Sequence, residues 1–325
     1  MRRGARRLIM LAVLMVAALG AYSLAPAQPK VTEVLIGSVL PLTGNFASLG
    51  QQYLWASQTV EDIVNNDYAD IQVPLGPGKG FPGLGGVPIK FIVRDDQSRG
   101  EQARTLVEQL ISVNKVHWFN GEGTSGITSL LQPVVESAGI PMSCHPCASP
   151  TLTEKGLKWF FRTGPNDKTM VASVFSFLKE WPERGGPKDL KTIALFTCDN
   201  LFCQDNRKVA TDLAPKAGFN IVLDLTTKTG ATTLASEVQR LQSAKADVLF
   251  AVQYPAETVV FENDAKRAGY MPKVIATSNG SYSDETWLQA QKKTNGAAGW
   301  LGRDPTAIDL VQDRPSWKKV NEIYK

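Results

Sequence analysis

The stretch VHWFNGEGTSGITSLLQPVVESAGIPMS, Val116–Ser143, contains the repeating unit from which we predict the fold. A short apolar run, Val116–Phe119, precedes a glycine-rich turn, and Ser125–Ser137 has the length and apolar spacing of an amphipathic helix. A second short run, Ile140–Ser143, follows directly. Strand, helix and strand in this order are typical of a parallel sheet with crossover helices.

The same alternation runs along the chain from Val34 onward. We predict further strands at Val34–Leu40, Ile89–Arg94, Thr192–Thr197, Ile221–Leu225, Asp247–Val252 and Val274–Thr277. Further helices are predicted at Gln51–Asn65, Glu101–Val113, Thr169–Trp181, Gln204–Lys216, Thr232–Ala244 and Glu257–Ala268. The fold class is therefore α/β. The Gly/Pro-rich segment Pro74–Gly86 has neither periodicity, which indicates a surface loop.

The segment KWFFRTG, Lys158–Gly164, separates two sets of four predicted strands, and we expect it to cross between them in extended form. This division predicts two similar lobes, each a parallel sheet flanked by helices, joined by hinge segments. We place the first lobe at residues 31–164, with 304–325 returning to it, and the second at 165–303. A ligand cleft is expected between the carboxyl ends of the two sheets.

The first residues have the features of a secretory signal peptide. Four arginines between residues 2 and 7 precede the apolar run Leu8–Leu19, and Ala25–Ala27 has the small-residue spacing of a cleavage site. The apolar run is shorter than the roughly 20 residues that span a bilayer. We predict cleavage near Ala27, which removes residues 1–27, and a periplasmic location.

Removal of that segment takes away four of the 35 basic residues and leaves 31 basic against 31 acidic ones. A neutral chain gives no electrostatic reason to expect nucleic acid as a partner. The 43% of hydrophobic residues is enough for a large core. No Gly-x-Ser-x-Gly elbow occurs and the chain has only two histidines, so we expect neither enzymatic activity nor a cofactor.

The loop GEGTSG, Gly121–Gly126, fits the dinucleotide fingerprint Gly-x-Gly-x-x-Gly, but its position argues against a nucleotide. The fingerprint normally follows the first strand of a βαβ unit, with an acidic residue about twenty residues on. Here it follows the third strand, and Pro141–Pro146 contains no acid. The hydroxyls of Thr124 and Ser125 at a helix amino end suit a carboxylate, although both residues are also ordinary helix caps.

The four cysteines form two close pairs, Cys144/Cys147 and Cys198/Cys203, and in an oxidising compartment we expect a disulfide within each pair. A cross-pairing is the alternative. The stretch CHPC also has the spacing of a redox dithiol or half a metal site. We favour a structural disulfide, because the surrounding fold differs from that of a redox domain, and we expect no metal. A bond between Cys198 and Cys203 would stiffen the position of Phe202.

Several stretches of the chain, taken in order and spacing, resemble one family. They are IGSVLPLTGNFASLG (Ile36–Gly50), VRDDQS (Val93–Ser98), GEGTSG, GIPMSCHPCASPTLT (Gly139–Thr153), FFRTGPND (Phe160–Asp167) and ALFTCDNLFCQD (Ala194–Asp205). The chain resembles the solute-binding proteins of branched-chain amino acid importers, which are type I periplasmic binding proteins served by ATP-binding-cassette (ABC) permeases. The similarity runs from about Val34 to the end.

The resemblance implies ligand-binding residues in the first lobe. Ser125, with Thr124 beside it, falls where the family holds the ligand α-carboxylate. The next turn supplies a carbonyl and a hydroxyl to the ligand ammonium, which places Pro146 and Ala148 in the site. Ala148 has no hydroxyl, so one acceptor is lost unless Ser149 replaces it. Leu49 lies where a family member carries an aromatic side chain that lines the pocket.

In the second lobe, the resemblance places Phe202 and Tyr254 as aromatic side chains that cover the ligand. Without it, both residues are equally well explained by core packing. The main departure is Asn279, which stands where amino acid binders carry an acid against the ligand ammonium. A neutral amide cannot balance a buried ammonium. Asp284 is a weaker substitute, so the ligand is either an amino acid or a non-amino carboxylic acid.

We therefore expect a periplasmic receptor whose lobes close on a small-molecule carboxylate or amino acid and deliver it to an ABC permease in the inner membrane. The alternative is a ligand-sensing module of the same fold that signals to a receptor or regulator. The chain stops at Lys325 within the amphipathic run Ser316–Lys325, whereas family members typically continue with more strand and helix. We expect the natural protein to be longer.

Overall fold

The computed structural model describes residues 31–71, 75–278, 300–302 and 314–324, which leaves the predicted signal peptide outside it. The helices and strands in these ranges belong to the compact unit Val34–Lys325. Residues 31–33, the described part of the other unit, contain neither. No helix in the described ranges combines the length and the apolar character that crossing a membrane requires.

The first sheet has five parallel strands in the order β2-β1-β3-β4-β5. Their bounds are β1 Val34–Leu40, β2 Ile89–Asp95, β3 Trp118–Asn120, β4 Met142–Cys144 and β5 Phe160–Arg162. The central strand β1 pairs with β2 on one side and β3 on the other. The carboxyl ends of β2, β1 and β3 therefore lie together at one edge of the sheet.

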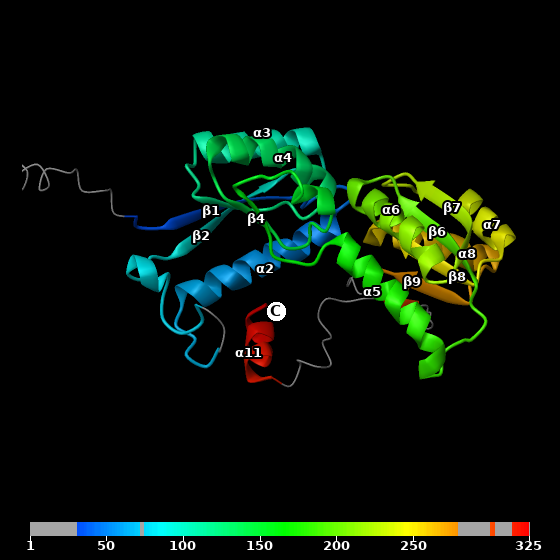
Figure 1. Cartoon of the computed structure of the whole chain (residues 1–325). Coiled ribbons are helices and arrows are strands. Elements are labelled where there is room, and N and C mark those ends of the chain that lie inside the picture. The colour runs from blue at the N-terminus through cyan, green and yellow to red at the C-terminus, as the bar shows by residue number, and fades with distance from the viewer. Residues whose placement is uncertain (1–30, 72–74, 279–299, 303–313, 325) are drawn as a thin grey trace, which may run out of the picture. The chain divides into compact units, whose positions relative to one another are not determined.

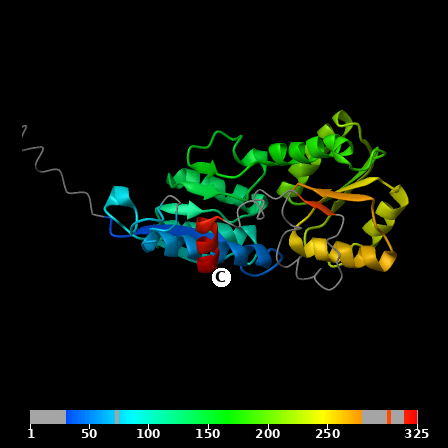
Figure 2. The same ribbon diagram turned by 90° about the horizontal axis from the view of Figure 1, so that it is seen from below.

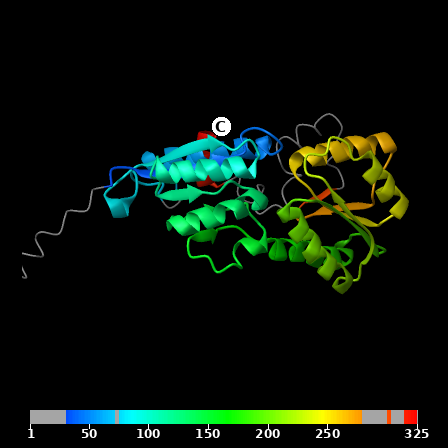
Figure 3. The same ribbon diagram turned by 90° about the horizontal axis from the view of Figure 1, so that it is seen from above.

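Helices cover both faces of this sheet (Figures 1 and 3). They are α2 Ala47–Asn65 on one face and α3 Gly100–Ser112 and α4 Ser125–Ala138 on the other. Helix α4 buries Ile127, Leu131 and Val135, which recur every fourth residue and so form one apolar stripe. Helix α11, Pro315–Tyr324, contacts α2 (Figure 2), and the Tyr324 ring lies 6.3 Å from that of Trp55.

The second sheet also has five parallel strands, in the order β10-β9-β8-β6-β7. Their bounds are β6 Thr192–Cys198, β7 Asn220–Thr227, β8 Val248–Val252, β9 Val274–Thr277 and β10 Trp300–Gly302. The associated helices are α5 Asp167–Glu180, α6 Leu201–Lys216, α7 Ala235–Ala244 and α8 Pro255–Ala268. Short 3-10 helices lie at Pro82–Leu84, Pro150–Leu152 and Trp181–Arg184.

The central strand β6 shows why this sheet is covered on both faces. Its side chains alternate between two apolar clusters, with Leu195 in the cluster that includes α5 and α6 and Phe196 in the cluster that includes α7 and α8. The Phe196 ring lies 5.0 Å from that of Phe261 in α8. A strand buried on both faces reads as a continuous apolar run, as Ile193–Phe196 does at the centre of β6.

The predicted α/β class with two parallel sheets is confirmed, but four strands per sheet was wrong. The expected crossing segment contains β5, which pairs with β4 from Phe160 to Arg162. The second extra strand, β10, pairs with β9 at the other sheet's edge. Each is a three-residue strand at the edge of its sheet, and pairing with a single neighbour makes it a strand. The lobe boundaries remain predictions.

Candidate functional site

The loop between β3 and α4 provides the amino end of a helix at the carboxyl edge of the first sheet. Gly123 has a φ of 109°, in the region that favours glycine, and a Cβ there would collide with the ring of Tyr53. Thr124 is extended at the N-cap position, and α4 begins at Ser125. The first amide groups of α4 are free of intrahelical acceptors, as at every helix start.

The hydroxyl of Thr124 is already occupied by a neighbouring carboxyl group. Its backbone N–H and its hydroxyl both donate to Oε2 of Glu122, at 2.7 and 2.6 Å. Ser125 instead accepts a hydrogen bond from the backbone N–H of Ser149 at 3.2 Å, which leaves its hydroxyl proton to donate. Of the two predicted carboxylate donors, Ser125 is the better placed.

The turn after β4 approaches this helix start. Ala148 and Ser149 are fully or almost fully buried, whereas Pro146 is exposed. The carbonyl oxygen of Ala148 accepts from the backbone N–H of Asp167 at 2.9 Å. Ser149 is the only one of the three residues with a hydroxyl, and that hydroxyl donates to Asp205 of α6. Ser149 therefore joins the first sheet to a helix of the second.

Both predicted aromatic side chains of the second lobe lie together with a residue from the first. The Tyr254 ring is 5.9 Å from that of Phe202 and 4.6 Å from that of Phe46, which directly precedes α2. The Tyr254 hydroxyl donates to Oδ1 of Asn200 at 3.4 Å, and a Cβ on Gly126 would meet the same amide. Asn200, after β6, therefore lies against the start of α4, and Tyr254, after β8, bonds to Asn200.

Two predicted residues are less well connected to this group. Leu49 is half-buried in the first turn of α2 and packs against the main apolar core. Asn279 lies outside the described residues, and so does Asp284. The preceding residue, Ser278, is buried at the end of β9 and its hydroxyl donates to Asn206 of α6.

Sequence reasoning missed Phe46, Asn200 and Glu122. Asn200 and Glu122 lie within two residues of a strand's carboxyl end, which is where open α/β sheets bind ligands, so the strand ends in the sequence could have indicated them. Phe46 precedes a helix and looks like a core residue. Only its ring contact with Tyr254 places it beside the predicted site.

Buried acids surround the predicted site. Burial, aided by the charge of Asp96, raises the pKa of Glu122 to about 8, and burial raises that of Asp96 itself to about 6. Burial also raises the pKa of Asp167 to about 8. The pKa of Tyr254 is raised well above its ordinary value by burial, with the charge of Glu122 the next contribution.

The four cysteines form the predicted bonds Cys144–Cys147 and Cys198–Cys203, with Cα–Cα distances of 5.6 and 5.2 Å. Each bond spans the turn that follows a strand, β4 in the first sheet and β6 in the second. With all four thiols bonded, none is left to act as a dithiol or a metal ligand. The part of the chain that the structure describes holds no group of three or more His, Cys, Asp or Glu side chains suited to a metal.

A family model for periplasmic binding proteins matches residues 33–309. The chain belongs to this family. Membership implies a location outside the cytoplasm, and the relatives named below are binding proteins rather than enzymes.

Curated members of the periplasmic binding protein family match over much of the chain. The Leu/Ile/Val-binding protein homolog 7 of Brucella suis biovar 1 (strain 1330) is 29% identical over 263 residues, which cover 80% of this chain and 62% of that protein. Homolog 8 of Brucella abortus (strain 2308) is 27% identical over 256 residues, 77% of this chain and 59% of that one. The match thus spans less than two thirds of either relative.

Solved structures of periplasmic binding proteins share the fold. A leucine-binding protein from Thermotoga maritima has a TM-score of 0.73 at 17% identity, covering 90% of this chain and 75% of that one. A solute-binding protein of an ABC transporter from Rhodopseudomonas palustris, in complex with 4-hydroxybenzoate, has a TM-score of 0.63 at 17% identity, covering 90% and 80%. At this identity the similarity establishes the two-lobed fold alone.

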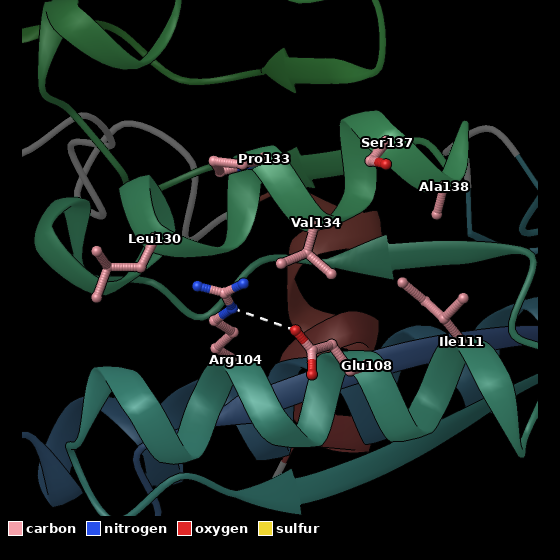
Figure 4. Close-up of a pocket in the computed structure, with 8 residues that line it drawn as sticks. All are labelled: Arg104, Glu108, Ile111, Leu130, Pro133, Val134, Ser137 and Ala138. Atoms are coloured by element: carbon pink, nitrogen blue, oxygen red, sulfur yellow. Dashed lines mark hydrogen bonds and ion pairs between the residues drawn. The ribbon is translucent and has the colours of Figure 1, made fainter.

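A surface pocket lies between α3 and α4, away from the residues described above (Figure 4). It is lined by Arg104, Glu108, Ile111, Leu130, Pro133, Val134, Ser137 and Ala138. Arg104 and Glu108 form an exposed ion pair there at 3.1 Å. None of the predicted ligand residues lines this pocket, and we assign it no role.

Proposed function

We propose that the chain is the extracytoplasmic solute-binding component of an ABC importer, which closes two lobes on a small carboxylate ligand and delivers it to a membrane permease. The observation that carries the proposal is the approach of the α4 amino end to Asn200, which follows β6 of the second sheet and accepts from the Tyr254 hydroxyl. This arrangement offers hydrogen-bond donors for an anion under an aromatic cover, within a family of binding proteins.

In this proposal Ser125 and the amides of α4 hold the ligand carboxylate, with Thr124 beside them. Phe202 and Tyr254 cover the ligand, Leu49 lines the side-chain pocket, and Pro146, Ala148 and Asn279 contribute to the rest of the site. Residues 31–164 and 165–303 form the two lobes. Ser149 takes the place of the hydroxyl that Ala148 lacks, because it follows directly and already bridges Ser125 and Asp205.

Two relatives suggest probe ligands that share a carboxylate. The Brucella relative is named for leucine, isoleucine and valine, and the Rhodopseudomonas neighbour holds 4-hydroxybenzoate. Thermal unfolding of the purified full chain should be measured with these four compounds and with 4-methylpentanoate, which is leucine without its amino group. A true ligand at 100-fold over its Kd should raise the free energy of unfolding by about 2.7 kcal/mol.

Ser125→Ala should remove most of that stabilisation, because it deletes the best-placed donor to the carboxylate. Ser129→Ala is the matched control, since the Ser129 hydroxyl donates within the same helix to the carbonyl of Gly126 at 2.7 Å. If none of the five probes stabilises the unmodified chain, or if both variants lose the effect equally, the proposed function is wrong.

A further inference from the structure

Two buried acidic side chains at the carboxyl edge of the first sheet have no described cationic partner. Asp96 directly follows β2 and Glu122 follows β3, and these strands flank β1 in the first sheet. Both side chains are completely buried. The adjacent Asp95, by contrast, is half-exposed and accepts hydrogen bonds from Thr43 and Gln97. Asp96 and Glu122 are therefore set apart by position and by burial.

Each of the two carboxyl groups uses one oxygen and leaves the other unused. Glu122 accepts from Thr124 through Oε2, and Asp96 accepts from the backbone N–H of Ser98 through Oδ1 at 2.8 Å. Oε1 of Glu122 and Oδ2 of Asp96 have no hydrogen-bond partner among the described residues. Buried polar atoms in native proteins are almost always paired, so two such oxygens indicate a group that arrives from outside.

The surroundings of Glu122 would favour a positive charge. No cation contributes to its pKa, which burial and the charge of Asp96 raise to about 8. The ion pairs found in the described residues engage other carboxylates, such as Asp224 with Arg207 and Asp247 with Lys273. The position also adjoins the proposed site, because Glu122 accepts from the backbone N–H and the hydroxyl of Thr124, the N-cap residue of α4 directly before Ser125.

We propose that Glu122 and Asp96 form a cation-recognising pair, which binds the ammonium group of an amine-bearing ligand. The pair thereby takes the role of the acid that amino acid binders carry at the position of Asn279. The inference rests on the proposed function, that the chain binds a small carboxylate-bearing solute. A ligand with both groups then has its carboxylate at Ser125 and the helix start, and its ammonium at Glu122. Both recognition groups belong to the first lobe.

The chemistry of the loop supports this assignment. A ligand that carries only a carboxylate meets a like charge when Glu122 is ionised, whereas an ammonium group neutralises that charge and gives Oε1 a donor. Removing one partner of a buried charge pair is strongly unfavourable, because the other charge is left unpaired. Glu122 and Asp96 therefore give specificity for ligands with an amine. Gln at position 122 keeps an oxygen for the Thr124 hydrogen bonds but loses the charge.

The test is isothermal titration calorimetry of the full chain with L-leucine and 4-methylpentanoate, for the unmodified protein and for Glu122→Gln and Asp96→Asn. Either substitution should weaken L-leucine binding about tenfold or more and leave 4-methylpentanoate within about threefold. Glu136→Gln is the control, because the Glu136 carboxylate accepts from Lys158 and Trp159 near the other end of α4. Thermal unfolding without ligand checks that each variant folds.

A second readout separates charge recognition from a structural role. At pH 7, pairing with an ammonium group should ionise Glu122 and release about one proton, measured by repeating the titration in buffers of different ionisation enthalpy. Glu122→Gln should abolish the release. Unchanged leucine affinity in both variants, or tighter binding of 4-methylpentanoate than of leucine, overturns the inference and leaves the proposed function standing. Binding of neither compound nor of 4-hydroxybenzoate rejects both.

Discussion

The burial of Glu122 makes the stability of the ligand-free chain depend on pH. Its folded pKa of about 8 lies above the ordinary value of 4.5, so the unfolded chain loses this proton first as the pH rises. The contribution of Glu122 to the free energy of unfolding should therefore be highest below about pH 4.5, fall through the range up to about pH 8 and then level off. This one group contributes a slope of up to about 1.4 kcal/mol per pH unit.

Glu122→Gln isolates that contribution in urea unfolding curves recorded between pH 5 and pH 8. The groups around Glu122 are Thr124, Asp96, Tyr53 and Tyr254. They remain in the variant, as does Asp167, whose raised pKa acts in the same direction. As the pH rises from 5 to 8, the free energy of unfolding of the unmodified protein should thus fall relative to that of Glu122→Gln. If the free energies of unfolding of the two proteins change with pH by the same amount, the assignment of this proton to Glu122 is wrong.

Among the helices and strands, the turn from β6 into α6 is fixed by the Cys198–Cys203 bond. The loop that the bond closes is short, so it should stabilise the fold by only about 2 kcal/mol. It also holds Asn200, whose amide contacts both Gly126 and the Tyr254 hydroxyl. We expect Cys198→Ala with Cys203→Ala to lower ligand affinity by a larger free energy than it lowers stability.

Calorimetric titration and thermal unfolding of the same double variant provide the comparison. The control is Cys144→Ala with Cys147→Ala, because that bond spans the turn after β4, where Ser149 keeps its own link to Ser125. Equal losses of binding and unfolding free energy after removal of Cys198–Cys203 would show that the bond serves the fold alone.

Ser149 is one of several links between the two sheets. Its hydroxyl donates to Asp205 of α6, and its carbonyl accepts from Arg162 of β5 at 2.8 Å. Ser149→Ala leaves Asp205 without this donor and should lower the free energy of unfolding by about 1 to 3 kcal/mol. Part of this loss should destabilise the proposed closed, ligand-binding arrangement of the two lobes. We expect a larger radius of gyration without ligand and about fivefold to tenfold weaker ligand binding.

Small-angle scattering measures the first effect, and titration with a ligand identified by thermal unfolding measures the second. Ser173→Ala serves as the reference substitution, because that hydroxyl bonds within α5 to the carbonyl of Met170. A radius of gyration that does not change in Ser149→Ala, together with unchanged affinity, would rule out a coupling role for this residue.

The periodicity of the chain alone predicted eight of the strands and the helices between them. Burial on both faces makes the centre of a strand such as β6 apolar from Ile193 to Phe196, and burial on one face gives α4 its repeating stripe, so these patterns are local. The spacing of the cysteines likewise predicted both disulfides, because residues three and five apart in a turn can reach each other.

Contacts between distant segments decided the rest. The edge strands β5 and β10 are defined by pairing with a single neighbour each, β4 and β9. The Thr124 hydroxyl is engaged by Glu122, and Phe46 meets Tyr254 across more than two hundred residues of sequence. Such contacts depend on how the two sheets bring their strand ends together. A local sequence pattern shows which side chains are buried, but it does not specify which distant residue each of them contacts.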